Sequence, residues 1–306
     1  MRHLLTTIAV LAAMTGAVAL AGCGSDPAPA EDPPADVEDE LGFDQAGILA
    51  RQSRVEAATR DCMRAQGFQY TPIDPYAQRA KLLGNARITD EEFLQQFGYG
   101  ISTLWGRGRN AADPNERARL ALAPADRRAY DSALWGENVG ASFTEAVDSG
   151  NFAKLGGCTR TATEKVFGGS QVLTELQGKL DELEERILQD QRMVRAIEAW
   201  SRCMAGRGFR YEEPESIDSD MFKRMEDIVG PLPGQFATGP APGEKARPID
   251  QSALSQLQRE EVATARADHA CEVEHIEPVE EEVAPQYADD FRQQNRQLMQ
   301  QVKPVQ

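Results

Sequence analysis

The chain has 306 residues, of which 41% are hydrophobic and only 7% aromatic, and its formal net charge is −16 at pH 7. This length is enough for one large domain or two smaller ones with packed cores. Nucleic-acid binding requires a basic surface, and this acidic sequence contains no long basic run. We therefore expect no nucleic acid among its partners, and the shortage of aromatic residues favours a helical core over a β-sandwich.

The first 22 residues have the pattern of a secretory signal. Arg2 and His3 precede an apolar run from Leu4 to Leu20, and a basic start before a short apolar segment is typical of a signal peptide. Residues 20–23, Leu-Ala-Gly-Cys, resemble the lipobox of bacterial lipoproteins, which implies cleavage after residue 22 and a diacylglyceryl thioether on Cys23. We expect this lipid anchor to hold the protein at the extracytoplasmic face of the cell membrane. The alternative is an ordinary secretory signal with an incidental cysteine.

Residues 23–43 are predicted to form a disordered tether. Residues 24–40 contain four prolines and seven acidic residues and no basic residue. Such a segment cannot bury a core and stays extended. We expect it to hold a folded domain, residues 44–303, away from the membrane surface.

Four helices are predicted in the first half of this domain. Apolar residues recur at helical spacing over residues 44–66, and residues 89–92, Thr-Asp-Glu-Glu, match a capping box that begins a short helix. Pro124 is suited to the first turn of a helix that ends before Gly136. The fourth helix begins at Cys158 and ends at about Phe167.

The strongest helical period in the chain runs through residues 171–207. Apolar residues lie at steps of three and four before and after Asp190: Leu173, Leu176, Leu180, Leu183 and Ile187, then Val194, Ile197, Trp200 and Met204. This stretch is expected to form one or two long helices, and Asp190 is the candidate cap of a second one. We expect this stripe to pack within the chain, and the alternative is a homodimeric coiled coil through residues 171–207.

The remaining sequence predicts three more helices and one long loop. The helices are expected over residues 214–229, over 250–271 and after Pro278. Residues 230–249 contain five prolines and four glycines and are predicted to form a flexible loop. Almost no stretch shows the alternation of a β-strand, so the predicted fold is mainly α: a multi-helix bundle of two related halves.

A nine-residue pattern, Cys-Met-x-x-x-Gly-Phe-x-Tyr, occurs at residues 62–70 and again at 203–211. In each copy we expect the glycine to end a helix in the left-handed conformation at position C′. The phenylalanine at C″ would then pack back on the methionine at C3. The predicted helix-cap residues are Met63, Gly67, Phe68, Met204, Gly208 and Phe209.

The four cysteines that follow Cys23 predict two disulfides, because exported proteins form such bridges and three connectivities are available to four cysteines. Each half, about 44–170 and 171–303, has a helix that ends in the repeated pattern and later a second cysteine beside an alanine-containing helix. This parallel favours pairing within each half, Cys62 with Cys158 and Cys203 with Cys271.

Several short motifs can be compared with a known family. They are Thr-Asp-Glu-Glu-Phe at 89–93, Gly-Tyr-Gly-Ile at 98–101, Ala-Pro-Ala-Asp at 123–126, Leu-Trp-Gly at 134–136, Trp-Ser-x-Cys-Met at 200–204 and Ala-Asp-x-x-Cys at 267–271. Together they resemble a group of uncharacterised secreted lipoproteins of actinobacteria, over roughly residues 45–300. This resemblance bears on fold and location and brings no established activity with it.

Residues that could bind a metal lie close together near the end of the chain. They are His269, Cys271, Glu274 and His275, and Cys271 and His275 would share one face of a helix, as a ligand pair does. If Cys271 is in a disulfide, however, no thiolate remains. We therefore expect neither a metal site nor another cofactor.

Acidic residues are the remaining candidates for chemistry. Glycosidases use two carboxyl groups at set separations across a cleft, and runs such as Glu184–Glu185 and Glu280–Glu282 offer carboxyls. In an acidic helical protein such runs are usually solvated faces, and no Gly-x-Ser-x-Gly nucleophile motif occurs, so no catalytic residue is assigned. We expect a non-enzymatic binding or scaffolding role in the cell envelope, with an envelope protein or a cell-wall component as partner. The alternative is a cell-wall polymer hydrolase, which two facing carboxyls with shifted pKa values would favour.

Overall fold

The computed structural model describes residues 36–85, 88–107, 114–140, 143, 146, 151–232 and 248–304. Within these ranges the regular elements are helices, without a β-strand, as the sequence predicted. The signal peptide, Cys23 and most of the predicted loop 230–249 lie outside the described residues.

The first half contains short helices whose ends follow local sequence signals. Asp44 caps α2 by accepting a hydrogen bond from the backbone N–H of Gly47, the capping box of α4 is complete at Thr89 and Glu92, and Pro124 occupies the first turn of α6. The elements are α1 (Val37–Glu40), α2 (Gln45–Ala65), α3 (Pro75–Leu83), α4 (Asp90–Phe97), α5 (Pro114–Ala121), α6 (Pro124–Trp135), the 3-10 helix η2 (Phe152–Lys154) and α8 (Gly157–Phe167).

The second half is built from longer helices. Asp190 caps the second of them through the N–H of Arg192, so the stripe over residues 171–207 forms two helices rather than one. Asp250 caps the long helix that follows the loop. The elements are α9 (Ser170–Leu188), α10 (Gln191–Gly206), α11 (Glu215–Val229), α12 (Gln251–His275) and α13 (Glu277–Met299).

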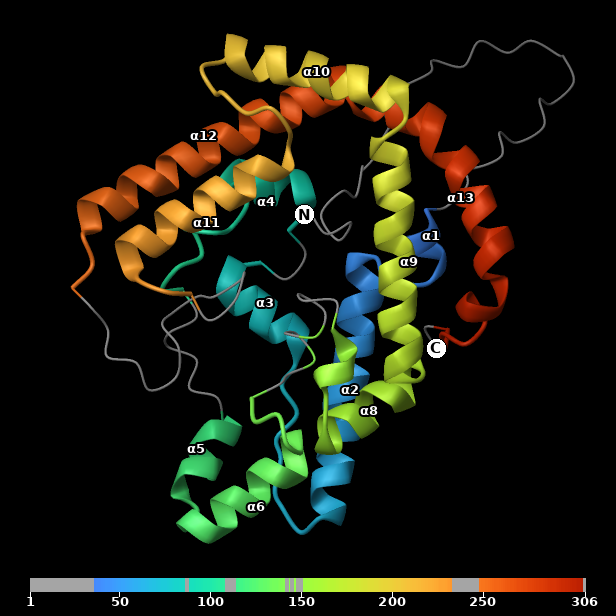
Figure 1. Cartoon of the computed structure of the whole chain (residues 1–306). Coiled ribbons are helices and arrows are strands. Elements are labelled where there is room, and N and C mark those ends of the chain that lie inside the picture. Colours follow the sequence, from blue (N-terminus) through green and yellow to red (C-terminus); the bar gives the residue numbers. More distant parts are fainter. Residues whose placement is uncertain are drawn as a thin grey trace, which may run out of the picture.

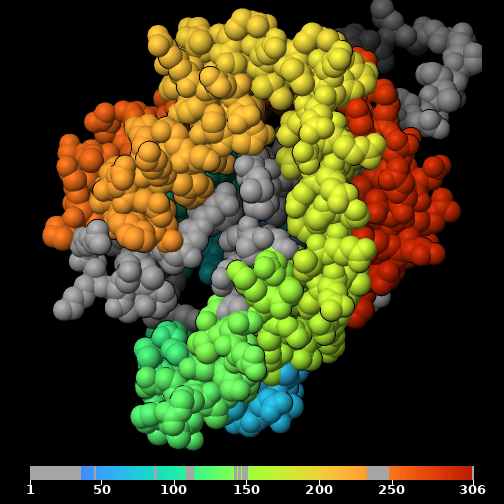
Figure 2. Space-filling model, viewed as in Figure 1, coloured from blue at the N-terminus to red at the C-terminus, as the bar shows by residue number. Residues whose placement is uncertain are grey.

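The helices form an arch (Figure 1). Helix α9 stands upright, α10 and α12 cross at the top, and α13 returns beside α9, where Figure 2 shows the two in contact. Helices α2 and α8 pack together at the lower end of α9, and α5 and α6 lie beyond them.

The apolar stripe of α9 is buried within the chain. Leu176, Leu180 and Leu183 pack in one cluster with residues of α1 and α13, and further along the stripe Trp200 and Met204 are fully buried in the largest core cluster. The intramolecular bundle therefore accounts for most of this stripe. Val194 on α10 is 43% exposed, and the homodimer through 171–207 stays an untested alternative.

The predicted disordered tether extends too far into the body. Residues 37–40 form α1, and Val37 is fully buried while Leu41 is 8% exposed. These two apolar residues, four positions apart, reach the same cluster on α9 and α13. The prediction of disorder up to residue 43 is therefore wrong for residues 36–43, because two well-spaced apolar side chains outweigh the acidic composition around them.

The two predicted halves share a core. Helix α4 from the first half packs on α12 from the second, and α4 ends at Gly98, where a Cβ atom would lie 3.1 Å from the backbone carbonyl of Glu261. Beyond it, Ile101 and Trp105 join the core cluster of α10, α11 and α12. The boundary near residue 170 therefore divides the sequence but not the packing.

Candidate functional site

The two copies of the repeated pattern end their helices in the same way. Gly67 has φ +83° and Gly208 has φ +96°. In the first copy the N–H of Phe68 donates to the carbonyl of Met63 at 2.9 Å, and in the second the N–H of Phe209 donates to that of Met204, also at 2.9 Å. These C″-to-C3 bonds define a Schellman motif.

Each motif places a cysteine in the last turns of its helix, and the cysteines pair within the halves as predicted. Cys62 on α2 is bonded to Cys158 on α8, with 1.98 Å between sulfurs, and Cys203 on α10 is bonded to Cys271 on α12, with 2.07 Å. In both bridges one cysteine is partly exposed and the other, Cys158 or Cys271, is buried. The two bridges therefore offer a matched pair for comparison.

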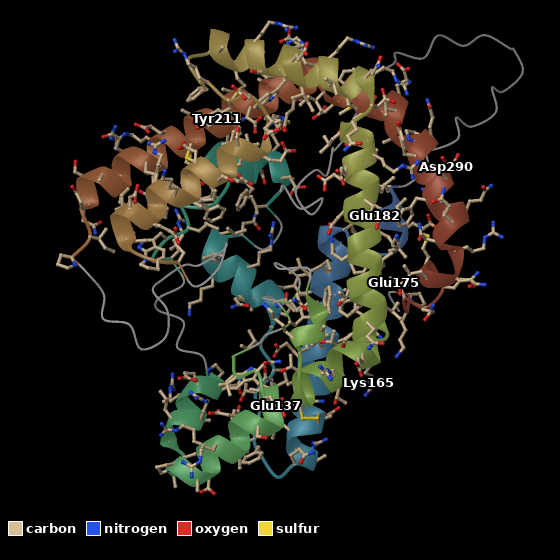
Figure 3. All side chains as sticks on the ribbon, viewed as in Figure 1. Glu137, Lys165, Glu175, Glu182, Tyr211 and Asp290 are labelled. Atoms are coloured by element: carbon tan, nitrogen blue, oxygen red, sulfur yellow. A yellow bond between two sulfur atoms is a disulfide. The ribbon has the colours of Figure 1, made fainter. Side chains whose placement is uncertain are left out.

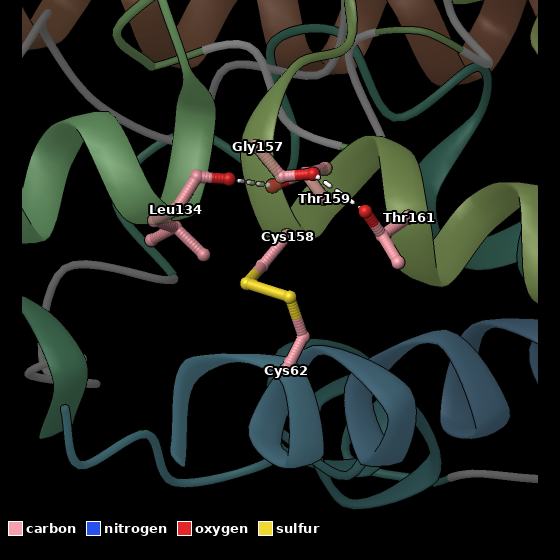
Figure 4. Close-up of a disulfide and its surroundings, with 6 residues drawn as sticks. All are labelled: Cys62, Leu134, Gly157, Cys158, Thr159 and Thr161. Atoms are coloured by element: carbon pink, nitrogen blue, oxygen red, sulfur yellow. Dashed lines mark hydrogen bonds between the residues drawn. A yellow bond between two sulfur atoms is a disulfide. The ribbon is translucent and has the colours of Figure 1, made fainter. Parts of the chain in front are cut away.

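The surroundings of the two bridges differ. Beside Cys158, the hydroxyl of Thr159 donates to the carbonyl of Leu134 at 2.9 Å (Figure 4). Beside Cys203, a carboxylate oxygen of Glu274 and a ring nitrogen of His275 lie within 4.8 Å of Sγ and of each other. His269, a further candidate ligand in the sequence, is not part of this group.

A buried carboxylate joins α12 to the segment that follows α4. Glu261 is 0% exposed and accepts hydrogen bonds from the backbone N–H groups of Ile101, at 2.8 Å, and Ser102, at 2.7 Å. The Ser102 hydroxyl also donates to it. Burial raises the pKa of Glu261, while these hydrogen bonds oppose that shift.

Asp268 makes a second polar connection two turns further along α12. It is 1% exposed and accepts hydrogen bonds from Tyr99 and Trp200. Sequence reasoning did not single out Glu261 or Asp268, although both have a detectable signal. They lie ten and three residues before Cys271, on the face of α12 that carries its core residues. An acidic residue at a core position of a helix requires hydrogen-bond partners, and this position is the signal.

Carboxyl groups from α1 and α9 form an acidic cluster. Burial, followed by the charges of Asp36 and Glu184, raises the pKa of Glu38 to about 8. Burial and the charges of Glu215 and Asp181 raise the pKa of Glu184 to about 7. Glu38 therefore holds a proton at neutral pH, and it can donate a hydrogen bond as well as accept one.

A groove of about 570 Å³ lies where α1 meets α13 and the C-terminal segment. Its polar wall includes Arg292, which donates to Glu40 at 2.8 Å and to Asp289 at 3.1 Å. The ammonium of Lys303 donates to carbonyls at the end of α8. The groove is lined by Glu40, Leu41, Asp289, Arg292, Gln293, Arg296, Met299, Gln300, Val302, Lys303 and Pro304.

A buried arginine lies behind this groove. Arg51 on α2 is 1% exposed, and its Nη2 donates to the carbonyls of Leu41, at 2.6 Å, and Lys303, at 3.0 Å. Its guanidinium carbon lies 5.2 Å from the ring centre of Phe43 and 4.8 Å from that of Phe167. Burial lowers the pKa of Arg51 to about 10, so it stays charged at neutral pH and ties both ends of the described chain to α2.

The chain has no match among the family models, the curated proteins or the solved structures with which it was compared. Among the described residues, no helix combines the length and the apolar composition that a membrane span needs.

Proposed function

We propose that this protein is a lipid-anchored lipoprotein of the extracytoplasmic membrane face, with a non-enzymatic binding role in the cell envelope. The lipobox at residues 20–23 supports the anchor on Cys23. Two disulfides within one chain are usual in exported proteins and rare in the cytosol. Residues 24–35 then lead directly into α1.

The observation that carries the binding role is the groove beside α1. The anchor segment enters the folded body at α1, and Glu40 and Leu41 at the end of α1 form one wall of the groove. A ligand in this groove would therefore be held next to the membrane tether. Among the described residues Arg296 has no ion pair, whereas the other two cations of the groove, Arg292 and Lys303, already have partners. A guanidinium favours a carboxylate or phosphate as its partner. We propose an envelope component that carries such an anionic group as the ligand.

Two measurements test this proposal. Mass spectrometry of the membrane fraction should find Cys23 at the N-terminus with a diacylglyceryl group, and an unmodified Cys23 would remove the anchor from the proposal. A photo-crosslinking amino acid at Gln293, in the groove, should capture an envelope component in intact cells. The same amino acid at Glu182, on the exposed side of α9 (Figure 3), serves as the control. Equal capture from both positions would contradict a binding site in the groove.

The alternative, a cell-wall polymer hydrolase, is favoured by one observation. Glu38 and Glu184 both have raised pKa values, and a general acid requires a carboxyl that is protonated near neutral pH. Glu38 is only 8% exposed, however, which leaves little of its side chain accessible to a polymer. The alternative would be established if the purified protein released soluble fragments from cell walls and the Glu184→Gln variant did not.

A further inference from the structure

The bridge between Cys203 and Cys271 differs from the other bridge in having metal-ligating side chains around it. Sγ of Cys203, a carboxylate oxygen of Glu274 and a ring nitrogen of His275 all lie within 4.8 Å of one another. Cys271 Sγ is bonded to Cys203 Sγ and so adjoins this group, although it does not lie within 4.8 Å of all three atoms. No comparable group of three or more ligands exists elsewhere in the part of the chain that the structure describes.

The four side chains supply the ligand set of a tetrahedral zinc site, and three of them, Cys203, Glu274 and His275, already lie close to its spacing. Two sulfurs, one imidazole nitrogen and one carboxylate oxygen are ligands that zinc binds at about 2.0–2.3 Å. Tetrahedral bonds of that length separate neighbouring ligand atoms by roughly 3.3–3.8 Å. His275 Nε2 and Glu274 Oε1 are already 3.6 Å apart. In the oxidised protein the two sulfurs are bonded to each other, so zinc binding requires that this bond is broken and that Cys271 Sγ moves towards Glu274 and His275.

The position of the cluster in the fold also favours a cation. Cys271, Glu274 and His275 occupy the last turns of α12, a helix of 25 residues that ends at His275. The carbonyl end of a helix carries partial negative charge and stabilises cations. Cys271 and His275 are four residues apart and therefore project from one face. Cys203 and His275 are partly exposed, so a solvent-borne thiol and a metal ion can approach this side.

We propose that this cluster is a redox-controlled zinc site. It is a disulfide when oxidised, and when reduced it binds zinc through both cysteine sulfurs, the imidazole of His275 and the carboxylate of Glu274. The reductant is a pair of external thiols such as glutathione. A first thiolate attacks Cys203 Sγ, the Sγ–Sγ bond breaks, and Cys271 leaves as a thiolate. A second thiolate attacks the external sulfur of the mixed disulfide, which frees Cys203 and releases the external disulfide. Two electrons pass to the protein, and because zinc keeps both cysteines as thiolates, the two protons of the external thiols remain in solvent.

The test compares the two bridges within one molecule. The purified full protein is equilibrated in glutathione buffers with and without a fixed concentration of free Zn²⁺, then alkylated, and thiols are counted by mass spectrometry. Zinc should lower the ratio of the squared concentration of reduced glutathione to the concentration of oxidised glutathione at which half of the Cys203–Cys271 bridges are reduced by at least tenfold. This change corresponds to about 30 mV in reduction potential. Half-reduction of Cys62–Cys158 should not shift, because the described residues around that bridge contain no such ligand group.

Two histidine variants separate coordination from simple thiol binding. His275→Gln should lose most of the zinc-dependent shift. His269→Gln changes a histidine on the same helix that lies outside the cluster and should keep the shift. Circular dichroism checks that both variants retain their helices. The proposal is overturned if zinc causes no shift, or if the shift is unchanged in His275→Gln. It is also overturned if both bridges shift equally, which is the result expected when the reduced chain unfolds and binds zinc through all its thiols.

Discussion

The buried carboxylate of Asp268 accepts a hydrogen bond from the indole N–H of Trp200, with 2.9 Å between Oδ1 and Nε1. Its other oxygen, Oδ2, accepts a hydrogen bond from the hydroxyl of Tyr99 at 2.7 Å. One side chain therefore joins α12 to α10 and to the segment after α4, one turn away from the Cys203–Cys271 bridge. Trp200 is itself 0% exposed, so its N–H relies on an acceptor inside the protein.

Replacing Asp268 with alanine should lower the free energy of unfolding by about 2–4 kcal/mol, because it removes the acceptor of two hydrogen bonds in the core. Urea denaturation followed by circular dichroism measures this change. Asp289→Ala is the matched control: its carboxylate pairs with Arg292 at the surface, and such pairs contribute about 0–1 kcal/mol. Equal losses in the two variants would show that Asp268 does not have the proposed role.

Adjacent residues on α12 allow a second comparison. Glu261 is buried and accepts three hydrogen bonds from Ile101 and Ser102, whereas Glu260 is partly exposed and pairs with Arg224 and Gln256. Glu261→Ala should cost about 3 kcal/mol or more, since hydrogen bonds to charged groups contribute about 1.5–3 kcal/mol each. Glu260→Ala should cost about 1 kcal/mol or less. Differential scanning calorimetry that ranks the two variants in the opposite order would contradict this assignment.

Two glycines near the end of α10 should respond to alanine with opposite signs. Gly208 has φ +96°, and no atom lies within 4 Å of a Cβ placed there, so the cost of Gly208→Ala is purely conformational. A left-handed residue with a side chain costs about 1–2 kcal/mol. Gly206 is the last residue of α10 and has equally open space, so Gly206→Ala should stabilise the protein, by at most about 0.5–1 kcal/mol. Melting temperatures measure both changes, and a loss in both variants would contradict the Schellman end.

The acidic cluster makes stability depend on pH. The ordinary pKa of Glu38 is 4.5, and in the folded protein it is about 8. Between these values the folded state holds a proton that the unfolded state has released, so stability should fall as pH rises from about 4.5 to 8. Above about pH 8 Glu38 is ionised in both the folded and the unfolded state, so its destabilising effect no longer changes with pH.

The variant Glu38→Gln should reduce this dependence, because a neutral amide cannot acquire the buried charge. Melting temperatures at pH 5.5 and 8 should differ less in Glu38→Gln than in the parent protein. Glu182→Gln, which changes an exposed residue paired with Lys179, should leave the difference as it is. A parent protein whose melting temperature rises between these pH values would contradict the shift.

Much of the helical framework could be predicted because its signals are local. Asp44, Thr89, Pro124, Asp190 and Asp250 act on backbone groups within a few residues of themselves, and each begins the expected helix. The predicted tether was too long for the same reason: acidic composition is a local signal, but the burial of Val37 and Leu41 depends on helices far away in the sequence.

The buried polar residues of α12 could not be assigned partners from the sequence. Glu261 is 159 positions from Ser102, and Asp268 is 169 from Tyr99, so no spacing rule connects them. The groove likewise brings α1 to the C-terminal segment, and Arg51 reaches across 252 positions to Lys303. Such sites exist only where chain segments meet in space.

By itself, the amino-acid sequence determined the helical class, most helix ends and the two glycine caps, because these depend on hydrogen bonds and conformations within one or two turns. Only the tertiary structure decided that several core clusters contain residues of both halves, that the stripe of α9 packs against α1 and α13, and that Glu274 and His275 lie beside Cys203. Those relationships follow from side-chain packing between distant segments, which local periodicity does not encode.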